Sequence, residues 1–195
     1  MPWPTSRDDA GMPGHLLLLT GSPGCGKTTV APLVADRHAR SACLDLDWFF
    51  AKLRSGAVSP WRPEAHAQNR VVLAAAAAAA AAFAAGGYDT VGEGILYPFM
   101  LDLFAAAAAP LGIDLHYAVL RAPVPVVQQR VRTRTVEPEH AGALTDEAVV
   151  EELWDLFEQQ GVEERHRVDA GQLSPDEIAG EIDRRWGQGD FRLTS

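Results

Sequence analysis

The sequence predicts an α/β fold, with a five-stranded, mostly parallel sheet in a three-layer α/β/α arrangement. Short apolar runs of strand length alternate along the chain with segments of helical periodicity, as is typical of parallel sheets. The first run, His15–Thr20, lacks polar alternation, which indicates a strand buried on both faces. The 195 residues fit one domain over 1–195, and we expect its core at about 15–186.

Five segments carry the strand pattern: His15–Thr20, Ser41–Leu46, Tyr88–Glu93, Leu115–Leu120 and Arg165–Asp169. Helices are expected between them at 28–40, 64–85, 99–109, 124–134 and 145–161, with a last helix from 175. Two signals mark helix ends. Gly86 and Gly87 stop the alanine-rich helix, and Ser174 with Glu177 forms a capping box before the last helix.

The helix expected at 64–85 contains nine consecutive alanines, which predict close packing on the sheet. Its apolar stretch, Val71–Ala85, is about 15 residues long and mostly alanine, which is too short and too weakly apolar to span a membrane. The first residues of the chain carry acids where a signal peptide carries bases. The sequence therefore predicts a cytoplasmic protein with no membrane partner.

Charge and cysteine content exclude several classes of protein. A net charge of −9 argues against a general nucleic-acid binder, whose surface is basic. Two cysteines, Cys25 and Cys43, do not make a disulfide scaffold. The six histidines lack metal-ligand spacing, so no structural zinc site is expected. We expect a small-molecule partner, no nucleic acid, and a monomer or homodimer.

One motif indicates the functional class. Residues 21–28, GSPGCGKT, fit the pattern G-x-x-x-x-G-K-[ST] between a predicted buried strand and a predicted helix. In this setting backbone N–H groups cradle phosphate oxygens, Lys27 reaches the β- and γ-phosphates, and the Thr28 hydroxyl ligates Mg²⁺. The motif predicts ATP and Mg²⁺ as cofactors. Cys25 is expected to serve as a small residue, and the alternative is a thiol whose pKa is lowered by Lys27 and the loop N–H groups. The expected nucleotide-contacting residues are Gly21, Ser22, Pro23, Gly24, Cys25, Gly26, Lys27, Thr28 and Thr29.

Two acids, Asp45 and Asp47, end the second predicted strand. Open α/β sheets bind ligands at this carboxyl edge. Residues two apart on a strand share a face, so we expect both carboxylates to point into one site. One would hold the magnesium shell and the other would accept a proton from an attacking hydroxyl. The alternatives are an ordinary strand-ending acid or a helix N-cap.

Four segments carry a family resemblance: GSPGCGKTT, LDLD, YDTVGEGIL and AVLRAPVPVVQQRVRTR. Together they resemble the small P-loop kinases, which include shikimate kinase, gluconate kinase, chloramphenicol phosphotransferase and the kinase module of polynucleotide kinase. The resemblance spans about 15–186, and the P-loop is its most specific part. It implies a P-loop NTPase fold, a helical lid at about 130–145 over ATP, and transfer of the γ-phosphoryl group to a small-molecule hydroxyl. By this resemblance Asp47 matches the aspartate that binds and deprotonates the acceptor, and Asp45 matches the one near magnesium.

The resemblance also suggests roles for an acid and two arginines. Glu93 ends the third predicted strand between glycines, in a Walker B-like position that faces a metal-bound water or the substrate. Arg130 and Arg134 lie one helical turn apart, and the resemblance suggests Arg130 for the adenine base and Arg134 for the catalytic lid. The loop at 168–171 would contact the purine edge. The alternatives are a solvated strand-end acid and a solvated basic helix.

The segment at about 48–70 lies where the related kinases bind the acceptor. Its charged residues sum to +3 in a chain of net charge −9, and they are Lys52, Arg54, Arg62, Glu64 and Arg70. We therefore expect an acceptor with a carboxylate or phosphate, clamped by Arg54 or Arg62. Trp48 and Trp61 would supply an apolar wall. The alternative is that the arginines line a solvated helix face.

These observations predict an ATP-dependent kinase that acts on a small molecule. The alternative function is an ATPase or nucleotide-binding regulatory module without a phospho-acceptor. The acidic pair after the second strand favours the kinase, because an ATPase switch needs a water-positioning residue that the sequence does not identify.

Overall fold

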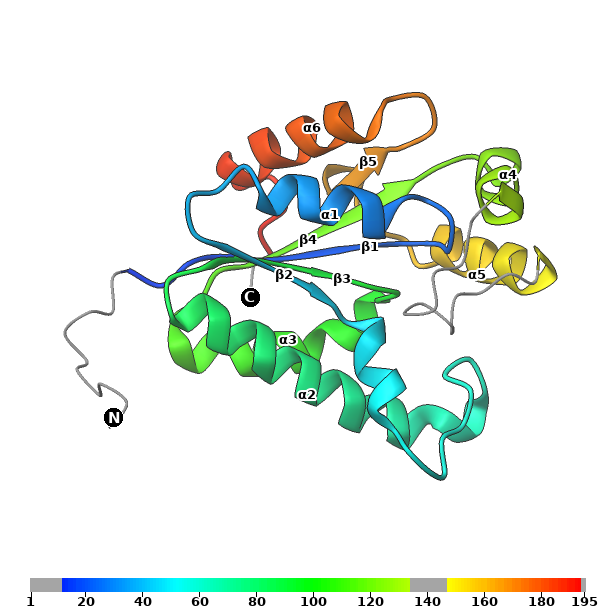
Figure 1. Cartoon of the computed structure of the whole chain (residues 1–195), viewed down its shortest axis with the longest axis horizontal. Helices are drawn as coiled ribbons and strands as arrows, with labels where there is room; N and C mark the ends of the chain where they lie inside the picture. Colours follow the sequence, from blue (N-terminus) through cyan, green and yellow to red (C-terminus); the bar gives the residue numbers. More distant parts are fainter. Residues whose placement is uncertain (1–11, 134–146, 194–195) are drawn as a thin grey trace.

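A sheet of five parallel strands organises the part of the chain that the computed structural model describes, residues 12–133 and 147–193 (Figure 1). The strands are β1 (Leu16–Gly21), β2 (Ser41–Asp45), β3 (Asp89–Glu93), β4 (Leu115–Arg121) and β5 (Arg167–Asp169). They lie in the order β2-β3-β1-β4-β5, and each neighbouring pair is parallel. The predicted α/β fold is confirmed, and all five predicted strands are present.

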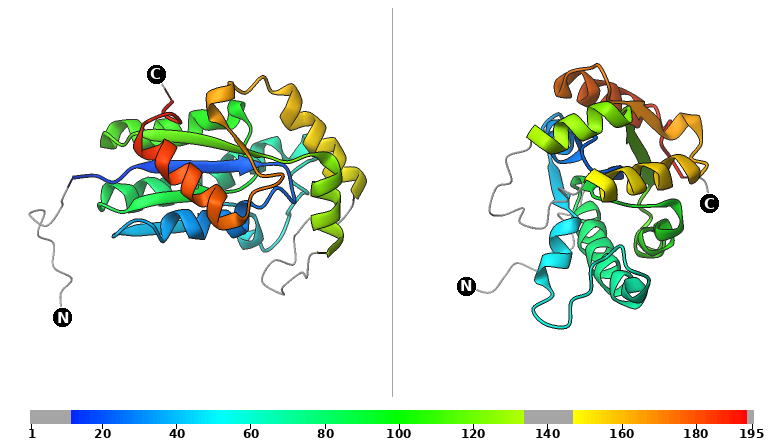
Figure 2. Two further views of the ribbon diagram at one scale, coloured as in Figure 1. Left: turned by 90° about the horizontal axis from the view of Figure 1, so that it is seen from above. Right: turned by 90° about the vertical axis from the view of Figure 1, so that its right-hand side faces the viewer.

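Helices cover both faces of the sheet. One face carries α1 (Lys27–Ala35) and α6 (Pro175–Gly187), and the other carries α2 (His66–Ala85) and α3 (Leu101–Ala108) (Figures 1 and 2). Beyond the carboxyl ends of the strands lie α4 (Val124–Thr133) and α5 (Glu147–Gln159). The predicted lid begins within α4, and its remainder, 134–145, lies outside the described residues.

Strand β1 lies at the centre of the sheet, and its four leucines are fully buried. Leu17 and Leu19 belong to the core shared with α1 and α6, whereas Leu16 and Leu18 belong to the core shared with α2 and α3. Successive side chains of a strand point to opposite faces, so an unbroken apolar run supplies both cores. The expectation of a strand buried on both faces is confirmed.

The alanines of α2 pack against the sheet as predicted. Ala76, Ala80 and Ala84 are fully buried in the core that α2 shares with α3, and the helix ends at Gly86. With the turn before it, this helix spans Pro63–Ala85, which by length and composition alone suffices to cross a membrane. The sequence prediction that this helix is too short to span a membrane considered only its apolar stretch, Val71–Ala85. A core helix of a soluble protein passes the same test, and the inner face of α2 is such a core surface.

The start of α6 also follows its sequence signal. The Ser174 hydroxyl accepts a hydrogen bond from the N–H of Glu177 (3.3 Å), and the Glu177 carboxylate accepts one from the N–H of Ser174 (2.8 Å). This reciprocal pair is the predicted capping box. It gives partners to backbone N–H groups that a helix N-terminus leaves unpaired.

Short 3₁₀ turns account for the main differences from the prediction. The segment directly after β2, for which no element was predicted, forms η2 (Asp47–Lys52). Three further turns carry proline at their first or second position, where its missing N–H costs nothing: η3 (Pro63–Ala65), η4 (Pro98–Met100) and η5 (Ala109–Leu111). A last turn, η7 (Glu164–His166), takes the residues predicted to begin the fifth strand, so β5 has only three residues.

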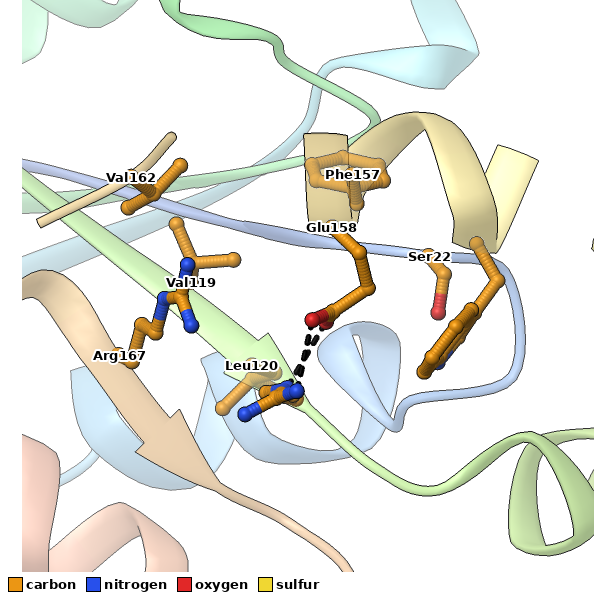
Figure 3. Close-up of a pocket in the computed structure, with 9 residues that line it drawn as sticks. Ser22, Val119, Leu120, Phe157, Glu158, Val162 and Arg167 are labelled. Atoms are coloured by element: carbon orange, nitrogen blue, oxygen red, sulfur yellow. Dashed lines mark hydrogen bonds and ion pairs between the residues drawn. The ribbon is translucent and has the colours of Figure 1, made fainter. Parts of the chain in front are cut away.

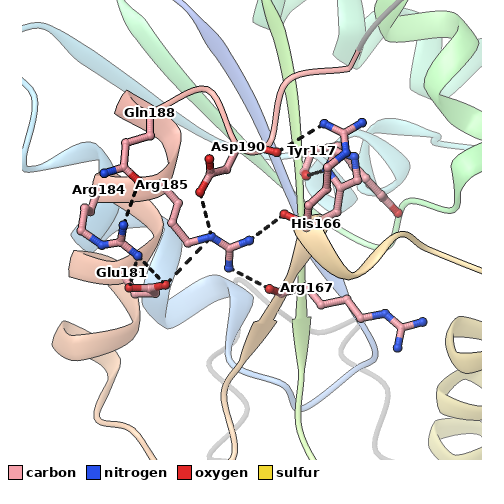
Figure 4. Close-up of polar contacts among 9 residues, drawn as sticks. Tyr117, His166, Arg167, Glu181, Arg184, Arg185, Gln188 and Asp190 are labelled. Carbon is pink, nitrogen blue, oxygen red and sulfur yellow. Dashed lines mark hydrogen bonds and ion pairs between the residues drawn. The ribbon is translucent and has the colours of Figure 1, made fainter.

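Arg185 of α6 lies against the outer edge of β5 (Figure 4). Its guanidinium donates hydrogen bonds to the carbonyl oxygens of Arg165 (2.6 Å) and Arg167 (2.9 Å). The N–H of Ala170 donates inward, to the carbonyl oxygen of Arg121 on β4. Because backbone groups alternate in direction along a strand, the carbonyl of Arg167 points away from the sheet. Arg185 therefore joins α6 to the outward side of the edge strand.

Candidate functional site

The segment between β1 and α1 has the geometry of a phosphate-binding loop. It leaves the carboxyl end of β1 and enters α1 at Lys27. Gly21 has a φ of 144°, and a Cβ added there would lie 2.3 Å from the carbonyl oxygen of Leu120. Gly26, with a φ of 107°, is the N-cap of α1. Glycine is required at both positions, because one lacks space for a side chain and both have a left-handed φ.

The loop brings several cationic and donor groups together. The buried Lys27 donates from Nζ to the carbonyl oxygens of Gly21 (3.0 Å) and Ser22 (3.2 Å). Thr28 and Thr29 are exposed in the first turn of α1. The N–H of Thr29 donates to the carbonyl oxygen of Gly26 (3.1 Å), which leaves the N–H groups of Lys27 and Thr28 at this helix start to attract anions. An ammonium, a hydroxyl and free N–H groups are the donors that a polyphosphate needs.

Asp45 and Glu93 meet at the carboxyl edge of the sheet. They are register partners on β2 and β3, and the N–H of Leu46 donates to the carbonyl oxygen of Glu93 (2.8 Å). Glu93 is only 4% exposed, so it is not the solvated strand-end acid of the alternative interpretation. A hydrogen bond links its carboxyl to the Thr28 side chain. The end of β3 therefore touches the first turn of α1.

The structure corrects the prediction that Asp45 and Asp47 share one face of a strand. The strand β2 ends at Asp45, and Asp47 is the first residue of η2. Oδ1 of Asp45 accepts a hydrogen bond from the N–H of Trp48 (3.0 Å), which holds the turn as a helix cap does. Asp47 still lies near enough to Lys27 and Asp45 for both charges to act on its carboxyl.

Two acids of this site, Glu93 and Asp47, have raised pKa values. Burial raises the pKa of Glu93 to about 7, with Lys27 opposing the rise and Asp47 and Asp45 adding to it. Asp47 is exposed as a residue, but protein atoms surround its carboxyl group. The resulting loss of solvent raises the pKa of Asp47, and the positive charge of Lys27 opposes this rise. The charge of Lys27 therefore acts on two carboxyls that have lost contact with solvent. Perturbed groups gathered in this way are typical of functional sites.

Arg130 of α4 joins the P-loop to the loop after β5. Its guanidinium donates to the carbonyl oxygens of Cys25 (3.2 Å) and Ala170 (2.9 Å). It is therefore held by backbone groups of two loops and is not part of a solvated basic face. Ala170 belongs to the loop predicted to contact the purine. Arg134, predicted for the lid, lies outside the described residues.

Cys25 fits the expectation of a small residue and not the alternative of a thiol with a lowered pKa. Cys25 is fully buried, and burial raises the pKa of its thiol. The charge of Lys27 and a hydrogen bond from its backbone act in the opposite direction but do not outweigh the burial. Cys25 therefore serves in the loop as a small buried residue.

The basic segment at 48–70 offers fewer unpaired cations to a ligand than its composition indicates. Nζ of Lys52 lies 3.0 Å from the centre of the Trp48 ring. Arg70 forms an ion pair with Asp102 of α3 (3.4 Å), and both side chains are at least half exposed. Two of the four cations predicted for the acceptor site therefore already have partners within the protein.

Arg54 and Arg62 are the two remaining cations of this segment. Both residues are exposed, and neither guanidinium forms a hydrogen bond or ion pair with another residue of the described ranges. Trp48 and Trp61 are 51% and 53% exposed, so each keeps half of its surface open to solvent. The structure thus leaves both arginines and Trp61 available to a ligand.

Two cavities in the described part of the chain touch the predicted site only at its margins. A cavity of about 20 Å³, room for one water molecule, lies between β4 and α5 beside Ser22 (Figure 3). At its edge Arg121 donates to both carboxylate oxygens of Glu158 (2.8 and 2.7 Å). Sequence reasoning missed this pair, because the residues are 37 positions apart and no local spacing signals the contact. A groove of about 460 Å³ between β5 and α6 is lined by Val168 and Asp169 of the loop predicted to contact the purine, but not by the P-loop or the acids at the ends of β2 and β3.

Comparisons with solved structures give the same fold. A sugar kinase from Janibacter sp. HTCC2649 superposes with a TM-score of 0.64 at 18% identity, covering 90% of this chain and 95% of that chain. An APS kinase from Mycobacterium tuberculosis has a TM-score of 0.64 at 19% identity, covering 91% and 99%. A gluconokinase from Sinorhizobium meliloti 1021 has a TM-score of 0.62 at 19% identity, covering 91% and 93%. None of the curated protein sequences matches this chain.

A family model described as an AAA domain matches residues 16–166. This range runs from β1 through η7 and includes the P-loop, Asp45, Asp47, Glu93 and Arg130. The predicted resemblance to small P-loop kinases is confirmed by the family match and the shared fold. The chain therefore belongs to the AAA domain family and has the P-loop NTPase fold of the small kinases.

Proposed function

We propose that this protein is an ATP-dependent kinase that transfers the γ-phosphoryl group of ATP to a hydroxyl of a small molecule. The observation that carries the proposal is the proximity of Lys27 in the P-loop to Asp47 at the start of η2, where the lysine charge acts on the carboxyl. Phosphoryl transfer needs a cation on the phosphate side and a proton acceptor on the hydroxyl side. The kinases that share this fold support ATP as the donor, since the APS kinase structure contains AMPPNP and APS.

The nucleotide binds at the P-loop in this proposal. Lys27 and the loop N–H groups hold the phosphates, and Arg130 lies toward the base. Thr28 and Asp45 would hold Mg²⁺, and an exposed hydroxyl with a carboxylate fits this ion, which prefers oxygen ligands and takes others from phosphate and water. Within 12–133 and 147–193, no three His, Cys, Asp or Glu residues are arranged to hold a metal ion together. We infer that Mg²⁺ enters with the nucleotide, where it neutralises phosphate charge.

The transfer step assigns the proton to Asp47. Its carboxylate accepts the proton of the acceptor hydroxyl while the acceptor oxygen forms a bond to the γ-phosphorus. The bond from that phosphorus to the oxygen of ADP breaks, which leaves ADP and a phosphate monoester. Lys27 stabilises the charge on the transferring group, and Arg134 of the lid would add a second cation. Glu93, hydrogen-bonded to Thr28, would orient the metal ligand or the substrate.

The acceptor carries an anionic group in this proposal. Arg54 and Arg62 support it, because they are exposed and have no partner in the described part of an otherwise acidic chain. A guanidinium binds carboxylate or phosphate through two parallel hydrogen bonds. The exposed ring of Trp61 would cover an apolar part of the acceptor.

An ATP-consumption screen tests the function directly. Its compounds are sugars, sugar acids, nucleosides, and aminoglycoside- or phenicol-type antibiotics, each incubated with ATP and Mg²⁺. We expect acceptor-dependent ADP release and a phosphorylated product by mass spectrometry. Lys27→Ala should lose nucleotide binding or turnover, whereas Lys52→Ala, at the other of the two lysines in the sequence, should keep its ATP affinity.

The outcomes separate the candidate functions. Unchanged turnover in Lys27→Ala would contradict the assignment of the P-loop. ATP hydrolysis that no acceptor accelerates would contradict the kinase and favour an ATPase or regulatory module. A product formed only from neutral or cationic acceptors would retain the kinase and remove the anionic clamp.

A further inference from the structure

The backbone of Leu96 is held by two side chains that come from other strands. The strand β3 ends at Glu93, so Leu96 has no strand partner for its N–H and C=O. Its N–H donates to Oγ1 of Thr20 (2.8 Å). Its carbonyl oxygen accepts hydrogen bonds from the hydroxyl groups of Thr20 (3.1 Å) and Tyr117 (3.0 Å). Three hydrogen bonds thus fix one residue of the loop after β3.

These bonds lie in the protein interior. Thr20 and Leu96 are fully buried, and Tyr117 is 2% exposed. Burial raises the pKa of Tyr117, so its hydroxyl keeps its proton and remains a donor. A buried hydrogen bond is hard to break, because no water replaces the lost partner. The loop is therefore held in one position relative to β1 and β4.

The same loop contacts the carboxyl of Asp47. The residue before Leu96 is Ile95, whose N–H donates a hydrogen bond to this carboxyl. This bond opposes the rise in the pKa of Asp47 that burial causes. At Gly94 an added Cβ would lie 3.2 Å from Oδ1 of Asp47, so the backbone approaches closely there too. On the other side, Thr20 directly precedes Gly21, the first residue of the P-loop. A continuous set of contacts therefore links the phosphate-binding loop to the acceptor aspartate.

We propose that Thr20 and Tyr117 are positioning residues that set the place of Asp47 relative to the P-loop, acting through Leu96 and Ile95. The inference rests on the kinase function proposed above. Phosphoryl transfer is sensitive to the relative position of donor and acceptor, because small displacements remove the near-attack geometry. Neither residue touches a reacting atom. Their loss should therefore lower the rate of transfer and leave nucleotide binding intact.

Two variants that remove one hydroxyl each test the proposal. With ATP and an acceptor identified by the screen, Tyr117→Phe and Thr20→Val should lower kcat roughly tenfold. The KM for ATP should stay within about twofold, because the P-loop itself is unchanged. Thr20→Ser keeps the hydroxyl and should restore kcat. Tyr97→Phe is the matched control, since the buried Tyr97 hydroxyl has no hydrogen-bond partner among the described residues.

Each result bears on one proposal or the other. A wild-type chain that phosphorylates no acceptor overturns the kinase function, and this inference with it. If the wild type transfers phosphate and Tyr117→Phe keeps the kcat of Tyr97→Phe, the inference alone is overturned. It is also overturned if Thr20→Ser fails to restore kcat, or if kcat falls only in step with the melting temperature, because either result would leave a merely structural role.

Discussion

Asp45 and Glu93 are register partners at the ends of β2 and β3, and the charge of Lys27 acts on the carboxyls of Glu93 and Asp47. The parallel pairing places the two strand-end acids side by side, although they are separated by nearly fifty residues along the chain. Loss of solvent raises the pKa of Glu93 and of Asp47, and neighbouring negative charges add to the rise, which the Lys27 ammonium opposes. The titration behaviour and the chemistry of the site both follow from this crowding.

Replacing Asp47 with asparagine should separate binding from transfer. Asp47→Asn keeps the size and polarity of the side chain but cannot accept the acceptor proton. We expect ATP affinity within a few-fold of wild type and a transfer rate lower by roughly 10²–10⁴. Calorimetric ATP titration and product assays measure the two quantities, and Asp36→Asn, at the exposed end of α1, is the control. A collapse of ATP binding would instead assign Asp47 to the metal shell or the fold.

Glu93 should make stability fall as pH rises. Its pKa is about 7 in the folded chain against an ordinary value of 4.5, so the folded state binds the proton more tightly between these values. Raising the pH from 4.5 to 7 should therefore cost about 3 kcal/mol of unfolding free energy from this group. Urea unfolding in EDTA without nucleotide measures it, and Glu93→Gln should remove this part of the slope. Glu64→Gln, an exposed acid, should leave the slope as it is.

His116 should make the stability of the folded chain fall as pH drops, which is the opposite of the effect expected from Glu93. Burial lowers its pKa to about 4, and neither ring nitrogen has a hydrogen-bond partner among the described residues. The unfolded chain binds a proton here below pH 6.5 while the folded chain does not, so stability should fall by up to about 3 kcal/mol as pH drops from 6.5 to 4. His116→Phe should be more stable than wild type at pH 5. An equal gain in His66→Gln, at an exposed position, would contradict this account.

Gly21 should not tolerate a side chain. Gly21→Ala combines a left-handed φ with a Cβ placed 2.3 Å from a backbone oxygen, which cannot move away as a flexible side chain would. We expect a loss of more than about 2 kcal/mol of stability, together with loss of nucleotide binding. Gly187→Ala, at the open end of α6 with no atom near the added Cβ, is the control and should be neutral or slightly stabilising. Thermal unfolding with and without ATP distinguishes the two.

Reversing the charge of Arg54 or Arg62 should weaken the acceptor alone. We expect Arg54→Glu and Arg62→Glu to raise the KM for an anionic acceptor about tenfold or more, with the KM for ATP unchanged. Arg70→Glu is the matched control from the same segment, because Arg70 already pairs with Asp102. If both reversals leave the acceptor KM unchanged, or if the acceptor is neutral, the anionic clamp is wrong.

The elements that could be predicted from sequence are those whose signals are local. The four leucines of β1 indicate burial on both faces without reference to any other segment, and Gly21–Thr28 form the P-loop from consecutive residues. The capping box of α6 is likewise complete within four positions. In each case the physical cause lies within one or two turns of chain, so the pattern alone is sufficient.

What escaped prediction depends on contacts between distant segments. Asp47 was expected on a strand, but β2 ends two residues earlier, where Asp45 caps the following turn. The pKa of Cys25 rises because neighbouring segments bury the thiol, and no sequence pattern reports that burial. The hydrogen bonds of Thr20 and Tyr117 to Leu96 join β1 and β4 to the loop after β3, and the spatial order of these three strands differs from their order along the chain. Side-chain partnerships of this kind become visible only when the sheet is assembled.

The contact of Arg185 with β5 has a consequence for how the folded protein behaves at high concentration. An edge strand offers unpaired backbone acceptors to which a strand from another molecule can add, and this is a common route to aggregation. The acceptor on Arg167 of β5, and that on Arg165 in the turn before it, are already occupied by one guanidinium of the same chain. The Arg185 side chain therefore hinders the addition of a strand from another molecule to β5. We expect Arg185→Met to fold as the wild type does but to be less soluble.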